Sequence, residues 1–154
     1  MTENIPLIKY IYTALMAMIP VVELRGAIPY GISQGCETLP TYICAVLGNL
    51  FPVPFIVVYV RKIFALLRTK IPFTDRLITW LEKRGEGRGE IVRRWRFLGI
   101  VILVAIPFPG TGAWTGALVA ALLDVRLKHA LPAAFLGLLI AGAIVLLPSV
   151  HLLG

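Results

Sequence analysis

The amino-acid sequence predicts an all-α integral membrane protein, and three observations support that fold class. Of the 154 residues, 58% are hydrophobic, and the mean hydropathy is +0.87. Four long apolar stretches fill most of the chain, at roughly 5–35, 39–67, 97–123 and 129–153. Most of the basic residues gather in one segment between them. A composition of this kind places the sequence in a bilayer, as a single membrane domain over residues 1–154.

Positive charge is concentrated in residues 61–96. This segment holds eleven of the fifteen Lys and Arg residues and four of the eight Asp and Glu residues, so its formal charge equals the +7 of the whole chain. The positive-inside rule places such a segment in the cytoplasm, beside anionic lipid headgroups. We expect a prokaryotic cytoplasmic membrane as the location. Because flanking membrane segments account for the basic patch, no nucleic-acid partner is expected.

Two of the four apolar stretches predict ordinary spanning helices. Pro40–Val60 is long enough to cross the hydrocarbon core, and two basic residues follow it directly. Ala130–Leu147, with an extension to Leu153, is almost free of polar groups. Both stretches are therefore expected to form transmembrane helices.

The other two apolar stretches are interrupted by helix breakers, the first over Pro20–Pro29 and the second over Ile106–Gly116. Each flanking arm has about ten to fifteen residues, which is too short to cross but suits a re-entrant hairpin. If the second stretch crossed, Arg126 and Lys128 would lie outside. If it is a hairpin, every Lys and Arg from 61 to 128 lies on one side. The sequence therefore predicts a hairpin here and, by symmetry, one in the first half with the N-terminus outside.

Two re-entrant hairpins, each followed by one spanning helix, make an inverted-topology repeat, an architecture of alternating-access transporters. The predicted first repeat is 1–62 and the second is 97–154. Residues 63–96 join them as a cytoplasmic, basic, amphipathic segment. Within it, the helical spacing of the apolar residues predicts an interfacial helix over 73–84.

Glu23 and Arg25 are the first candidate site residues, because ionisable groups at membrane depth are costly and usually face a partner, a cavity or a transport path. An unwound tip, with Gly26 beside them, lets both side chains point into a central cavity. Glu23 can exchange a proton there. Arg25 can bind an anionic substrate bidentately, phosphate in particular. The structural alternative is an internal salt bridge that fixes the tip.

The second hairpin tip forms the other half of the candidate site. A helix that starts at a tip points free N–H groups and its positive dipole end at the midplane, which suits an anion. Trp114 packs on a substrate or fills the protein interior. Asn49, near the middle of the first spanning helix, either bonds to another helix or contacts substrate. The candidates at this tip are Pro107, Pro109, Gly110, Thr111, Gly112, Trp114 and Thr115.

The sequence holds no arrangement typical of a catalytic site. There is no Ser–His–Asp set and no pair of carboxylates, so an enzyme is not expected. Cys36 and Cys44 have no His or second Cys pair at metal-ligand spacing, so no metal site is predicted. The glycines of the second tip lack the Gly-Lys-Ser/Thr ending of a P-loop, and no cofactor is predicted.

Two motifs carry a resemblance to a known family. Glu-Leu-Arg-Gly-Ala-Ile-Pro at 23–29 and Pro-Phe-Pro-Gly-Thr-Gly-Ala-Trp-Thr-Gly-Ala-Leu at 107–118 resemble the two signature motifs of the small multi-drug export protein family. The resemblance covers essentially the whole chain and implies a transporter. That family is distantly similar to the DedA membrane proteins, which have paired re-entrant hairpins and are associated with translocation of polyprenyl-phosphate lipids. Glu23 and Arg25 match the acids and arginines of DedA hairpins, whereas the second hairpin here has neither.

The sequence thus predicts a secondary transporter or lipid flippase. Its substrate is expected to be amphipathic, anionic and lipid-phosphate-like, and to pass through a midplane site between the hairpins, with Glu23 handling a coupling proton. A homodimer is expected, because so small a protomer offers little wall to a pathway. One alternative is a proton-coupled exporter of hydrophobic cations, with Glu23 alone as the substrate site. The other is a non-transporting membrane scaffold that recruits partners through residues 61–96.

Overall fold

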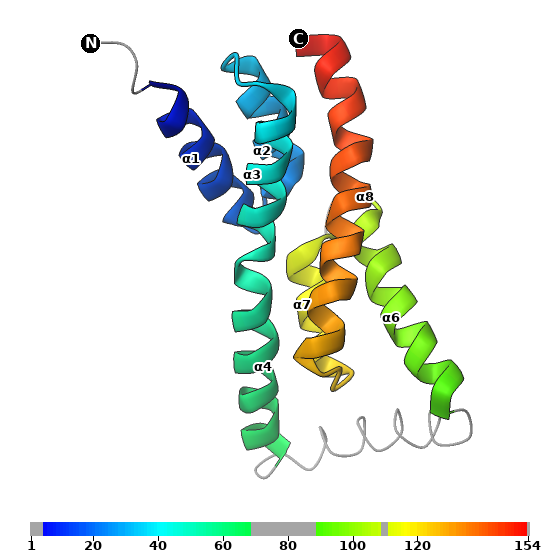
Figure 1. Ribbon diagram of the computed structural model, residues 1–154. Helices are drawn as coiled ribbons and strands as arrows, with labels where there is room; N and C mark the ends of the chain where they lie inside the picture. The colour runs from blue at the N-terminus through cyan, green and yellow to red at the C-terminus, as the bar shows by residue number, and fades with distance from the viewer. Residues whose placement is uncertain (1–4, 69–88, 109–110, 154) are drawn as a thin grey trace.

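The computed structural model describes residues 5–68, 89–108 and 111–153 (Figure 1). Within these ranges every regular element is an α-helix and no strand occurs, in agreement with the predicted all-α class. In chain order the helices are α1 (Ile5–Met18), α2 (Glu23–Ser33), α3 (Thr38–Leu50), α4 (Pro52–Arg68), α6 (Gly89–Ala105), α7 (Ala113–Leu122) and α8 (Leu127–Leu153).

Two helices are long and apolar enough to cross a membrane. The first is made by α3 and α4, which run on across Phe51, and its apolar part is the 26-residue stretch Thr38–Ile63. The second is α8, with 27 residues. They agree with the two spanning helices expected from the sequence. The two lie beside each other through the middle of the molecule (Figure 1), since α8 contacts both α3 and α4.

The two interrupted stretches fold into helical hairpins. Helix α1 runs from the end of the molecule that holds the N-terminus to about its middle, and α2 returns to the same end (Figure 1). Helices α6 and α7 do the same from the opposite end. Helices α1, α2 and α7 have ten to fourteen residues, and the apolar part of the 17-residue α6 is Trp95–Ala105. At 1.5 Å per residue, such lengths amount to roughly half of a ~30 Å hydrocarbon core. The tips of both hairpins therefore lie near the middle of the long helices.

The two hairpins share unusual backbone conformations at equivalent places. At the tips, Glu23 has a φ of 49° and Gly112 a φ of 149°. After the returning helices, Gly35 has a φ of 75° and Asp124 a φ of 54°. Both pairs are separated by 89 residues (23 to 112, and 35 to 124). In both turns the N–H of the next residue donates to the carbonyl five residues before it, which closes the end of the helix.

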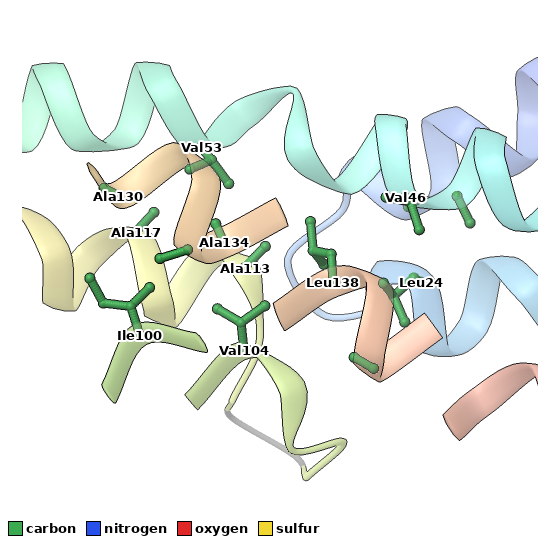
Figure 2. Packing of buried hydrophobic residues seen from close by; sticks show 14 of the residues in the cluster. Leu24, Val46, Val53, Ile100, Val104, Ala113, Ala117, Ala130, Ala134 and Leu138 are labelled. Carbon is green, nitrogen blue, oxygen red and sulfur yellow. The ribbon is translucent and has the colours of Figure 1, made fainter. Parts of the chain in front are cut away.

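Small side chains let the helices approach closely. Figure 2 shows Leu138 of α8 in one buried cluster with Leu24 of α2 and Val46 of α3, while alanines of α7 and α8 lie near α6. Val104 of α6 packs so near to Gly137 of α8 that a Cβ there would lie 2.6 Å from it. Since lipid supplies no hydrophobic drive between helices, such close van der Waals packing is what holds membrane helices together.

Gly48 gives the sharpest test of this packing, because a Cβ at this position of α3 would overlap the backbone of Ala14 in α1. We expect Gly48→Ala to lower the free energy of unfolding by about 1–3 kcal/mol, the usual cost of overpacking. The measurement is thermal unfolding of the detergent-solubilised protein. Gly99→Ala is the matched control: it is also helical, but its Cβ meets nothing within 4 Å. The same unfolding temperature for both variants would contradict the close contact.

Candidate functional site at the hairpin tips

Glu23 and Arg25 extend from the first turn of α2 toward the second hairpin. Glu23 is the first residue of α2, and its φ of 49° lies in the left-handed region that few residues with side chains adopt. It is buried, with 6% of its surface exposed. Arg25 is half-buried. The two charged groups reach different parts of the second tip.

The Arg25 guanidinium binds the backbone where α6 ends. Its Nη2 donates to the carbonyl oxygen of Ile106 at 3.2 Å and to that of Thr111 at 2.5 Å. Nη1 donates to the carbonyl oxygen of Phe108. The last carbonyls of a helix have no partner within it, and a cation at that end is favoured by the helix dipole. Arg25 thus closes the C-terminal end of α6 from the other hairpin.

Thr111 organises the same backbone from within. Its Oγ1 lies 2.7 Å from the Ile106 carbonyl oxygen and 2.8 Å from that of Phe108, to either of which the hydroxyl can donate. It also accepts from the Phe108 N–H at 3.2 Å and from Arg25 Nη2 at 3.1 Å. Pro107, which is exposed, has no N–H to offer. The hydroxyl and the guanidinium therefore share the carbonyls left open by the break.

The Glu23 carboxylate lies at the N-terminal end of α7. It faces the backbone N–H of Trp114, in the first turn of α7. A Cβ on Gly112, the N-cap residue of α7, would overlap its carboxylate oxygens. The first N–H groups of a helix lack internal partners and carry positive partial charge, so a carboxylate is stabilised there. Gly112 has no side chain with which to cap α7, and the Glu23 carboxylate occupies the space that such a side chain would fill.

Trp114 and Asn49 satisfy the backbone of the first tip. The indole Nε1 of Trp114 donates to the carbonyl oxygen of Met18, the last residue of α1, at 3.1 Å. Asn49 is fully buried, and with its amide turned to match its neighbours it bridges the tip. Its nitrogen then donates to the Ala17 carbonyl and its oxygen accepts from the Leu24 N–H, both at 3.3 Å. The open ends of α1 and α2 are closed by side chains from elsewhere.

Glu23 and Arg25 do not form the internal salt bridge that was one interpretation of the sequence. In the described parts of the chain, the ion pair is between Arg61 and Asp124, at 2.6 Å. Arg25 instead faces carbonyl and hydroxyl oxygens. Each charged group therefore serves a different helix end.

The structure brings five of the predicted site residues together and leaves others apart. Gly26 lies in the first turn of α2, where a Cβ would meet Val22. Thr115 is half-buried in the first turn of α7. Asn49 of α3 bonds to the backbone of the first tip. Pro109 and Gly110 lie outside the described residues. The residues that meet between the hairpins are Glu23, Arg25, Thr111, Gly112 and Trp114.

Sequence reasoning missed the backbone partners of these side chains. Met18, Ile106 and Phe108 contribute carbonyl oxygens, which every residue type possesses, so no side chain marks them. The available signal was position alone, because each lies at or just after the end of a helix that a proline-containing break follows.

A protein-family model matches more than half of the chain. The family is described as "Putative small multi-drug export protein", and the match covers residues 23–144. It begins at Glu23, so it includes Glu23, Arg25 and the whole second hairpin, while α1 and the turn 19–22 lie before it. No curated protein and no solved structure matches the chain.

Asn49→Leu tests the closure of the first tip. The substitution leaves the Ala17 carbonyl and the Leu24 N–H buried without a partner, and each such loss costs about 1–3 kcal/mol. We therefore expect a clear fall in the unfolding temperature of the purified protein. Ser149→Ala is the matched control, because Ser149 is also buried but its hydroxyl donates to Val145 of its own helix. Comparable losses in the two variants would argue against the bridging role of Asn49.

Proposed function

Because the chain belongs to the small multi-drug export protein family, we propose that it is a secondary transporter that moves a small amphipathic molecule between its two hairpin tips. The two helices long enough to cross a membrane agree with a membrane location. The observation that carries the proposal is that one carboxylate and one guanidinium join two broken helices in the middle of an apolar molecule. Ionisable groups at that depth typically mark a transport path.

The proposed transporter consists of two inverted repeats, each with a re-entrant hairpin. If α1 is exchanged with α6, α2 with α7, and α3–α4 with α8, the helix contacts map onto one another: α1·α3 onto α6·α8, α2·α8 onto α4·α7, and α2·α3 onto α7·α8. The 89-residue interval at the tips and at the hairpin ends supports the same correspondence. Hairpins that enter from opposite ends of the molecule (Figure 1) suit alternating access around a midplane site.

In this proposal residues 63–96 lie in the cytoplasm, between the repeats 1–62 and 97–154. Most of that segment lies outside the described residues, including the interfacial helix predicted over 73–84. The first turn of α1 and the last turn of α8 lie at one end of the molecule, and the end of α4 and the start of α6 lie at the other (Figure 1). This arrangement agrees with a topology in which the N-terminus is outside and residues 63–96 are in the cytoplasm. The homodimer remains an expectation from the small size of the protomer.

The tip geometry favours an amphipathic anion of the lipid-phosphate type. Among the described residues Arg25 has no carboxylate within ion-pair distance, and its guanidinium faces only neutral oxygens, of Ile106, Phe108 and Thr111, so an anion that displaces these bonds would gain a charged partner. The start of α7 is a second anion site, held by Glu23. When Glu23 takes up a proton, its cap on α7 weakens and a substrate anion can take the same place. The resemblance of Glu23 and Arg25, in the first hairpin, to the acids and arginines of DedA hairpins is in keeping with such a substrate.

The family description favours a second candidate, the proton-coupled export of hydrophobic cations. In that case the Glu23 carboxylate binds the substrate, and the cation and the proton compete for it. Arg25 then repels the substrate and serves only as the tie between α2 and the end of α6. The sign of the substrate's charge separates the two candidates.

Glu23→Gln tests the coupling role. Glutamine keeps an oxygen that can face the Trp114 N–H but cannot take up a proton, so we expect transport driven by a pH gradient in reconstituted vesicles to fall to background while the unfolding temperature changes little. Glu37→Gln removes the same charge from an exposed position and should leave the rate unchanged. Wild-type transport by Glu23→Gln would exclude the coupling role. If Arg25→Gln also left the transport rate unchanged, the result would favour the alternative of a non-transporting membrane scaffold.

Arg25→Gln distinguishes the two substrate classes. Losing a charge-assisted hydrogen bond costs about 1.5–3 kcal/mol, so transport of an anionic amphiphile should fall at least about tenfold. Transport of a cationic amphiphile with the same tail should stay equal or rise. Arg25→Lys keeps the charge and should restore much of the anion transport. Equal losses for both amphiphiles, without rescue by lysine, would mean that Arg25 acts on the fold alone.

A further inference from the structure

A cavity of about 790 Å³ lies away from the hairpin tips, at the end of the molecule where α6 begins and α8 starts. Residues 96–98 of α6 form one wall. The turn between α7 and α8, residues 124–126, and residues 128–129 of α8 form the other. The two helices diverge toward this end (Figure 1). The transport proposal uses none of these residues.

The lining of this cavity carries an excess of positive charge. Arg96, Arg126 and Lys128 line it, against Asp124 as the acid. The Asp124 carboxylate is already paired with Arg61 of α4, at 2.6 Å. Within the described parts of the chain, no carboxylate pairs with the three basic side chains. The first N–H groups of the 27-residue α8 add positive partial charge at the same place.

Apart from His129, the rest of the lining is apolar, and this apolar part continues onto the outer surface of α6. Phe97 and Leu98 belong to the cavity wall. Leu98 and Ile102 lie one turn apart on α6 and are 47% and 54% exposed. Trp95, which is 67% exposed, lies at the same end, as aromatic residues do at the membrane interface. A molecule in this cavity meets cations on one side and a membrane-facing apolar surface on the other.

We propose that this cavity binds the phosphate headgroup of an anionic lipid from the cytoplasmic leaflet, with the acyl chains along α6. Arginine and lysine bind phosphate oxygens through charge-assisted hydrogen bonds. A free phosphate would use the cations alone, whereas a lipid uses both parts of the lining. The bound lipid ties α6 to the α7–α8 turn and so steadies the second hairpin at the end opposite its tip. The site rests on the membrane location and on the cytoplasmic placement of residues 63–96 proposed above, but it does not require that the protein transports a substrate.

The test uses the full-length protein in a neutral detergent, titrated with a short-chain phosphatidylglycerol and, separately, with the matching phosphatidylcholine. We expect the anionic lipid to raise the unfolding temperature and to remain bound in native mass spectrometry, and the zwitterionic lipid to do neither. Lys128→Gln should weaken the apparent affinity about fivefold, which corresponds to about 1 kcal/mol for one basic residue. Lys62→Gln is the matched control, an exposed lysine on α4 outside the lining, and it should bind as the wild type does.

Three outcomes would overturn the assignment. The first is equal stabilisation by the two lipids. The second is equal weakening by Lys128→Gln and Lys62→Gln, which indicates a general attraction of the basic surface. The third is full protection by inorganic phosphate at the same concentration, which indicates a soluble anion. Arg126→Lys keeps the charge and should bind nearly as the wild type does, so a loss in Arg126→Gln alone is due to charge. None of these measurements follows transport, so a negative result for lipid binding does not bear on the transport proposal.

Discussion

A helix that ends in apolar surroundings leaves backbone N–H and carbonyl groups that water cannot reach, and the described part of this chain has four such ends near its middle. Side chains of each hairpin reach the open helix ends of the other hairpin. From the first hairpin, Glu23 caps the start of α7 and Arg25 closes the end of α6. From the second, Trp114 reaches the end of α1, while Asn49 of the long helix bridges the first tip. Neither hairpin would have its backbone satisfied without the rest of the molecule.

The closure at the tips differs in kind from the packing around it. Helix α7 buries only alanine and glycine residues, so its buried face offers methyl groups rather than interlocking side chains. Such a face permits close approach but fixes position weakly. The position of the second hairpin therefore depends strongly on the hydrogen bonds at its tip. Bonds that involve a carboxylate can be changed by a proton, which packing cannot.

The fold was the more predictable part, because the length of apolar runs and the places of proline and glycine bear on it directly. The sequence predicts a spanning helix over Ala130–Leu153, and α8 covers Leu127–Leu153. The directions of the site residues were less predictable. Glu23 and Arg25 reach different helix ends, and Glu23 does so from a left-handed backbone conformation that local preference disfavours. Their partners at Ile106 and Phe108 are backbone atoms, which leave no trace in residue type.

The use of carbonyl oxygens as partners has a consequence for how this fold tolerates change. A carbonyl oxygen does not depend on the side chain of its residue, so exchanges at Met18, Ile106 or Phe108 leave the bonds to Trp114 and Arg25 available wherever the chain path is kept. In each of these hydrogen bonds only the donor, Trp114 or Arg25, must keep its side chain. Paired substitutions between related sequences would therefore carry little record of this contact, although it joins the two halves of the molecule.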